Sequence, residues 1–312
     1  MESAMNIGIG WMILGGVANG VMLLLAAPFF EGILRQVTAR IQSRQGPPLW
    51  QPYFDLLKLL GKEDLESGES PAMQRFAAYL SLAATLTTAW LVPLGFRAPF
   101  NSSGDVIVLI YLLTLGVVST LMAGLAAGST YSLLGMSREM MSAITLEPLF
   151  AVALIIGATH THSLRLDAVL NGSVYASPHG PWSGLIMMVI FLLAFQAFVK
   201  RVPFDVACAE TEIMEGPMVE YSGPKLALFK CAEMAKLVLY SGLFVALFVP
   251  WGSGLAFPLN AGVFWLKVLV LVLGVTVVAA THARFRIDQA IRYYAGLLAA
   301  AAAALVLAVY GY

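Results

Sequence analysis

The sequence predicts an all-α integral membrane protein with about eight transmembrane helices. Hydrophobic residues make up 59% of the 312 residues and charged residues only 12%, with a mean hydropathy of +0.81. Soluble domains carry roughly a quarter charged residues, so this composition belongs in a bilayer. The apolar residues gather into runs close to the roughly 20 residues that a helix needs to cross a membrane. We expect a single transmembrane domain covering residues 1–312.

Eight apolar runs are long enough to span. In chain order we expect helices at Asn6–Phe29, Met73–Leu94, Asp105–Ala127, Glu139–His160, Ser183–Val199, Lys225–Pro250, Ala261–Thr281 and Ile291–Tyr310. Two shorter elements fall between them. The amphipathic segment Pro52–Leu60 predicts a short interfacial helix in the first connection. A second short helix is expected at about Asp205–Glu215, with Asp205 as its N-cap and Gly216-Pro217 at its end.

Lysine and arginine predict the orientation. The opposite connections hold only Arg97 and Arg165, whereas the odd-numbered connections carry Arg35, Arg40, Arg44, Lys58, Lys62, Arg75, Arg138, Lys200, Arg201, Arg284, Arg286 and Arg292. Positive residues are enriched in cytoplasmic loops. We therefore expect the odd connections to be cytoplasmic and both termini to lie outside, in the cytoplasmic (inner) membrane of a cell.

The fifth connection is unusually acidic. Within about 16 residues it holds five carboxylates, at Asp205, Glu210, Glu212, Glu215 and Glu220. Ionisable groups beside membrane helices are costly unless they are paired or hydrated, and they commonly mark function. The two uses we expect are proton handling and the docking of a partner on the cytoplasmic side.

Charged residues also lie inside the predicted helices. They are Glu139 and Glu147 in the fourth helix, and Lys230, Glu233 and Lys236 in the sixth. Glu233 is three residues from each lysine, so all three can meet on one helical face. Glu147 precedes Pro148, which removes a helix hydrogen bond and frees a backbone carbonyl. These five residues are the candidates for an intramembrane proton path; a satisfied ion pair that only fixes helix packing is the alternative.

Several functions are excluded by what the sequence lacks. Two cysteines are too few for an iron–sulfur cluster, and there is no CxxC, Gly-rich phosphate loop or HExxH motif. A formal net charge of zero gives no basic surface for nucleic acid. We expect no catalytic centre, cofactor or metal in this chain. If it belongs to an enzyme, the redox chemistry takes place on other subunits.

Several ordered motifs resemble one family, the NuoH/ND1 membrane subunit of respiratory complex I and its counterparts in membrane-bound nickel–iron hydrogenases. The motifs are ARIQSRQGP at 39–47, PFD at 203–205, ETE at 210–212, EYS at 220–222 and RFRIDQ at 284–289. Four features are similar to the hydrogenase branch of this family, of the formate hydrogenlyase, hydrogenase-4 or carbon-monoxide-linked type. They are the short segment between Pro47 and DLLKL at 55–59, SRE at 137–139, LEP at 146–148 and EGP at 215–217.

The resemblance implies a membrane anchor and coupling subunit of an energy-converting hydrogenase, a non-redox part of an oxidoreductase complex. A nickel–iron centre and iron–sulfur clusters would sit on hydrogenase large and small subunits and iron–sulfur subunits, beside antiporter-like membrane subunits, and their electron transfer would drive proton or sodium movement. The docking and coupling surface would comprise Arg40, Arg44, Asp205, Glu210, Glu212, Glu215, Glu220, Arg284, Arg286 and Asp288.

One departure from the family stands out. The family commonly has a glutamate five residues before the proline of the PFD motif, where this chain has Phe198. A carboxylate relay therefore does not carry over at this position. The alternatives are a quinone-chamber subunit of a complex I-type dehydrogenase, a stand-alone ion transporter, and a purely structural anchor without an ion path.

Overall fold

The computed structural model describes residues 2–65, 70–95, 98, 100, 104–177, 179–252, 254–256 and 258–311, with only the backbone for residues 2–9 and 11. Arg97, one of the residues that bear on the orientation, lies outside the described residues. The all-α class is confirmed: the described residues form helices, and their only β-type pairing is an isolated bridge between Asp105 and Arg165.

The helices follow the apolar runs closely. The long ones are α1 (Glu2–Ile41), α3 (Pro71–Leu91), α4 (Val106–Ala127), α5 (Thr130–Thr161), α7 (Trp182–Phe198), α9 (Gly223–Phe248), α10 (Leu259–Thr281) and α11 (Ile287–Val309). The short ones are α2 (Gln51–Leu60), α6 (Leu166–Val169), α8 (Glu210–Ile213) and the 3₁₀ turns η1 (Ser173–Tyr175) and η2 (Gly216–Met218).

The expected number of eight spans is not matched exactly. Among the described helices, six are long and apolar enough to cross a membrane, and α7, with 17 residues, is shorter. The remaining long helix, α3, is not among the six. It carries Gln74, Ser81 and several threonines, and buries most of these polar groups inside the bundle, so its hydropathy understates how well it fits there.

Three predicted boundaries were wrong. Helix α1 continues to Ile41 instead of ending at Phe29, and α5 begins at Thr130 instead of Glu139. The helix expected from Asp205 shrinks to Glu210–Ile213. Asp205 does not cap it, because its carboxylate accepts a hydrogen bond from Arg284 instead.

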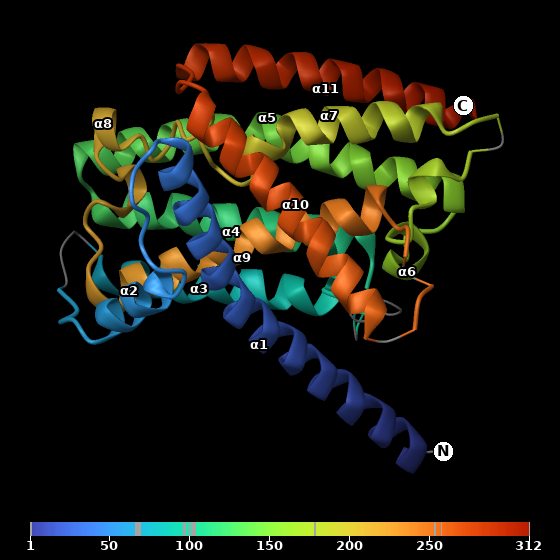
Figure 1. Cartoon of the computed structure of the whole chain (residues 1–312), viewed down its shortest axis with the longest axis horizontal. Coiled ribbons are helices and arrows are strands. Elements are labelled where there is room, and N and C mark those ends of the chain that lie inside the picture. The colour runs from blue at the N-terminus through green and yellow to red at the C-terminus, as the bar shows by residue number, and fades with distance from the viewer. Residues whose placement is uncertain are drawn as a thin grey trace.

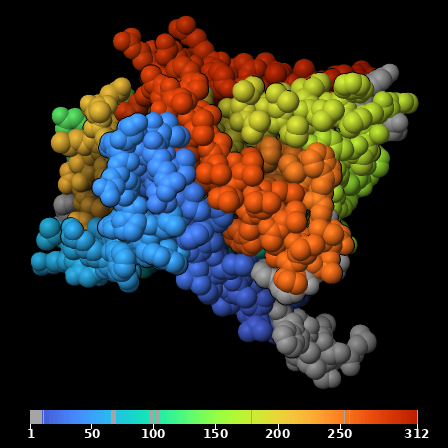
Figure 2. Space-filling view, in the orientation of Figure 1, coloured from blue at the N-terminus to red at the C-terminus, as the bar shows by residue number. Residues whose placement is uncertain are grey.

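The long helices form one bundle in which α9 is the most enclosed (Figure 1). Helices α3, α4 and α9 pack together, α11 lies along α5 and α7, and α1 crosses α9 and α10. Helices α2 and α8 lie at one end of the bundle; α6 and both termini lie toward the other. Figure 2 shows the face covered by α1, α2 and α10.

Candidate functional site

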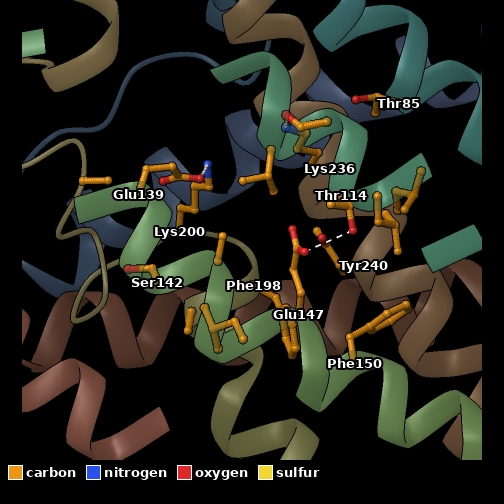
Figure 3. A pocket seen from close by; sticks show the side chains of 18 of the residues that line it. Thr85, Thr114, Glu139, Ser142, Glu147, Phe150, Phe198, Lys200, Lys236 and Tyr240 are labelled. Atoms are coloured by element: carbon orange, nitrogen blue, oxygen red, sulfur yellow. Dashed lines mark hydrogen bonds and ion pairs between the residues drawn. The ribbon is translucent and has the colours of Figure 1, made fainter. Parts of the chain in front are cut away.

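A cavity of about 70 Å³ lies inside the bundle, lined by residues of α3, α4, α5, α7 and α9 (Figure 3). We call it the inner cavity. Glu147 of α5 points into it, and the Thr114 hydroxyl of α4 donates to Glu147 Oε2 at 3.1 Å. The other oxygen, Oε1, is buried and has no hydrogen-bond partner among the described atoms. Burying a polar oxygen without a partner is unfavourable, so this atom is placed to accept a proton or a water.

The side chain of Lys236, on α9, also lines the inner cavity (Figure 3). Its Nζ donates to the Gly116 carbonyl of α4 at 3.0 Å. A Cβ at Gly116 would lie 3.3 Å from Lys236 Cε, so a larger residue there would require the lysine to shift by a few tenths of an ångström. The expected meeting of Glu233 with both lysines is only partly seen. Glu233 lies 3.9 Å from Lys230, and no ion pair between Glu233 and Lys236 occurs among the described residues.

Glu139 has a partner that the sequence reasoning missed. Its buried carboxylate forms an ion pair with Lys200, which follows the C-terminal end of α7. Burial alone would lower the pKa of Lys200, but the neighbouring acidic groups, Glu139 first among them, together outweigh burial and the pKa is raised. Lys200 is therefore a permanently charged ammonium at neutral pH.

A second cavity, of about 450 Å³, lies toward the end of the bundle that carries α2 and α8. We call it the loop-side cavity. Its charged lining comprises Glu31, Arg35, Lys200, Arg201, Asp205, Glu210, Glu215, Lys230, Glu233 and Lys236. The two cavities share five lining residues: Phe198, Lys200, Asp205, Cys208 and Lys236. A line of ionisable groups thus runs from the loops to Glu147 in the middle of α5.

Glu31 is a second functional candidate that the sequence reasoning missed. It is 4% exposed and forms ion pairs with Arg201 and, at 3.3 Å, with Arg35. Arg35 also contacts Asp55 of α2 at 2.8 Å. The chain Asp55–Arg35–Glu31–Arg201 therefore links α2, α1 and the fifth connection. One part of this network could be predicted from the sequence, because Glu31 lies four residues before Arg35 and such pairs meet on one face of a helix.

Part of the acidic loop is tied to the bundle. Arg138 of α5 contacts Glu212 at 2.6 Å, and its guanidinium lowers the pKa of that exposed carboxyl. Arg284 contacts Asp205 at 3.1 Å. Burial nevertheless raises the pKa of Asp205 to about 6, against the opposing effect of Arg284. The charge of Asp205 therefore changes close to neutral pH.

The other predicted docking residues are placed differently. Glu215 lies 3.6 Å from Lys230, whereas Glu210 makes no ion pair among the described residues. Four more are exposed and line neither cavity: Arg40, Arg44, Arg286 and Asp288. Glu220 is partly buried near the start of α9. The structure thus brings the path candidates together and leaves most of the docking candidates on the surface.

Phe198 stands where the family commonly has a glutamate. Its ring stacks on Phe191 and on Tyr240, with centroids 5.0 Å and 5.6 Å apart. Phe150 meets it edge-on at 6.0 Å. Phe198, which lines both cavities, is therefore held in an aromatic cluster at the position where the family commonly has a carboxylate.

The fold and the site define a multi-pass membrane protein that carries a line of charged groups from its loops into the helix bundle. The family is shown by the comparison of sequences: the family described as NADH dehydrogenase matches residues 16–310, and the chain belongs to this family.

Individual relatives refine this assignment. The chain is 36% identical to hydrogenase-4 component C and 32% identical to formate hydrogenlyase subunit 4, both of Escherichia coli (strain K12), covering 89% and 88% of this chain and 90% and 92% of those proteins. It is also 32% identical to a NADH-quinone oxidoreductase subunit of Anaplasma phagocytophilum (strain HZ), over 90% of each chain.

A solved structure agrees with this family. A chain of an archaeal respiratory membrane complex, the membrane-bound sulfane sulfur reductase, superposes with a TM-score of 0.84 and 26% identity, covering 95% of this chain and 99% of that one. Together these findings make the protein a membrane subunit of an oxidoreductase complex.

Proposed function

We propose that this chain is the membrane anchor and coupling subunit of an energy-converting nickel–iron hydrogenase complex. It would link electron transfer in a cytoplasmic arm to ion movement through the bundle. The observation that carries the proposal is that the two cavities share lining residues. The loop-side cavity contacts the acidic loop, and the inner cavity contains Glu147. The similarity to hydrogenase-4 component C and formate hydrogenlyase subunit 4 supports the hydrogenase branch.

The proposed partners are those that the resemblance to the hydrogenase branch implies. Hydrogenase large and small subunits and iron–sulfur subunits would hold the nickel–iron centre and the clusters, and antiporter-like subunits would lie beside this chain in the inner membrane. We place α2, α8 and the acidic loop on the cytoplasmic side. Both termini lie toward the opposite end of the bundle (Figure 1), which supports an outer location for them.

The runner-up is a quinone-chamber subunit, which the relationship to the NADH-quinone oxidoreductase of Anaplasma phagocytophilum favours. Purification of the complex through a tag on this chain separates the two. We expect a nickel–iron large subunit among the co-purified chains and no hydrogen-dependent reduction of a quinone analogue. Quinone reduction that a quinone-site inhibitor blocks would assign the chain to the runner-up.

The acidic loop gives a separate prediction about docking. Replacing Glu210, Glu212 and Glu215 together by Gln should weaken attachment of the soluble arm, because charges at the rim of an interface govern assembly and its salt sensitivity. The measurement is the fraction of arm retained on the tagged membrane subunit as salt is raised.

Single variants separate docking from loop packing. Glu212→Gln breaks the intramolecular contact with Arg138, whereas Glu210→Gln breaks no ion pair among the described residues. Docking requires Glu210→Gln to reduce retention by itself. If the triple variant retains the arm and its coupling at every salt concentration, the loop is only a solvated connector.

A further inference from the structure

Thr114 is the hydrogen-bond partner of Glu147. Its hydroxyl, on α4, lies 3.1 Å from Glu147 Oε2 on α5 (Figure 3). Among the described residues this is the one hydrogen bond that the Glu147 side chain makes, and Oε1 is buried without a partner. The two oxygens of the carboxyl are therefore in different situations, and Thr114 makes the difference.

The other buried threonines of the long helices behave differently. They are Thr85, Thr88, Thr120 and Thr276. Each donates to a carbonyl three or four residues earlier in its own helix. A local bond of this kind satisfies a threonine hydroxyl without a second element. Thr114 has such an acceptor too, because the Ile110 carbonyl lies 3.0 Å from its hydroxyl. The contact with Glu147 is therefore additional to what α4 itself requires.

The Thr114 hydroxyl has one hydrogen and two acceptors within reach. The Ile110 carbonyl is neutral, whereas the Glu147 carboxyl is charged when it is ionised. A hydrogen bond to an ionised acceptor is roughly twice as strong as one to a neutral acceptor. The hydroxyl hydrogen therefore turns to Glu147 when the carboxyl is ionised, and Ile110 remains as an acceptor when the carboxyl is protonated. The threonine is satisfied in both states.

The second oxygen of Glu147 is left for water. The inner cavity, of about 70 Å³, is large enough for a water molecule, and the hydroxyls of Ser142 and Tyr240 line it as well. With Oε2 held by Thr114, Oε1 is the atom that takes a proton from such a water. Return of the same proton to water restores the carboxylate. Thr114 keeps its own hydrogen throughout.

We propose that Thr114 is a positioning residue of the proton path: its hydroxyl holds Oε2 of ionised Glu147, so that Oε1 alone exchanges protons. The inference rests on the proposed coupling function and deepens it by naming the group that orients the carboxyl. The carbonyl of Gly116, two residues further along α4, accepts from Lys236 at 3.0 Å. One turn of α4 therefore holds an ionisable group from α5 and another from α9.

The first test measures proton movement by the purified complex in sealed vesicles, normalised to hydrogen oxidation by a soluble dye. Thr114→Val removes the hydroxyl and should lower proton movement by roughly tenfold, the factor that a hydrogen bond to a charged group supplies. Thr114→Ser keeps the hydroxyl and should retain most of the movement. Dye-linked oxidation should be unchanged in both, because it requires only the arm.

A matched control lies on α5 itself. The Thr145 hydroxyl contacts the carbonyls of Met141 and Ser142, at 3.1 and 3.0 Å, and Thr145 does not line the inner cavity. Thr145→Val removes the same group two residues from Glu147 and should leave proton movement near the wild-type level. Equal losses in Thr145→Val and Thr114→Val would show a structural effect of losing a helical hydroxyl and would overturn the inference.

A double variant tests whether Thr114 acts through Glu147. Coupling between two groups in contact appears as non-additivity, so Thr114→Val should cause no further loss when it is added to Glu147→Gln. An additional loss of the same size as in the wild-type background would overturn the inference. If Thr114→Val does not assemble, Thr114→Ala removes the hydroxyl with a smaller side chain and is compared in the same way.

A spectroscopic measurement reports on the contact without any ion movement. The carboxylate stretching band of ionised Glu147 is followed in infrared difference spectra of the purified complex between low and high pH, and is assigned by its loss in Glu147→Gln. The band should shift in Thr114→Val and stay in place in Thr145→Val. An unshifted band in Thr114→Val would overturn the inference. The expected shift in a complex whose wild type moves no protons would support the contact and refute the coupling function.

Discussion

Glu147→Gln and Lys236→Met should each lower hydrogen-driven ion movement by about two orders of magnitude, the lower end of what a positioned proton-transfer group contributes. Both should spare hydrogen oxidation measured with a soluble dye. The two side chains line the same cavity, where Glu147 has a free oxygen and Lys236 donates to the Gly116 carbonyl. Removing either interrupts the path without touching the arm, because the dye assay requires only the arm.

A matched control exists in α10. The Lys267 Nζ also donates to a backbone carbonyl, that of Val249 at 2.8 Å, but Lys267 lines neither the inner nor the loop-side cavity. Lys267→Met therefore removes the same type of group and should leave ion movement near the wild-type level. If Glu147→Gln and Lys236→Met assemble normally and move ions as the wild type does, these residues only fix the packing of α4, α5 and α9.

The helices could be predicted from the sequence because apolar runs report directly on burial in a bilayer. The ends of the helices could not. Helix α1 continues through Glu31 and Arg35 because these charges find partners in Arg201 and Asp55, which lie far away in the sequence. Glu31 lies beyond the apolar run that ends at Phe29, so the run itself does not indicate that Glu31 is buried in a helix. The same limit applied to Glu139, whose partner Lys200 lies beyond the end of another helix.

The charged residues of α9 show which contacts helical spacing can predict and which it cannot. Spacing of three residues places Glu233 near both Lys230 and Lys236, and the contact with Lys230 is present. Spacing alone does not say which neighbour offers a better acceptor. The Gly116 carbonyl of α4 accepts from Lys236. This acceptor belongs to another helix, so the spacing of residues within α9 could not predict it.

Arg201→Met should destabilise the protein more than any surface substitution. It would leave the Glu31 carboxylate buried, with only the 3.3 Å contact to Arg35. Removing one partner of a buried pair costs about 3 kcal/mol or more. The expected result is a lower midpoint of thermal unfolding for the detergent-solubilised protein. The midpoint is measured by size-exclusion chromatography of samples heated to increasing temperatures.

Two further variants show whether the buried charge is the cause. Arg165→Met breaks the exposed pair with Asp167, at 2.9 Å, and should cost less than about 1 kcal/mol, as surface pairs do. Arg201→Met combined with Glu31→Gln removes the unpaired charge and should recover much of the lost stability. Equal midpoints for Arg201→Met and Arg165→Met would mean that water reaches Glu31 through the loop-side cavity and hydrates it. The network from Asp55 to Arg201 would then hold α2 to the fifth connection only weakly, and the position of α2 would not depend on it.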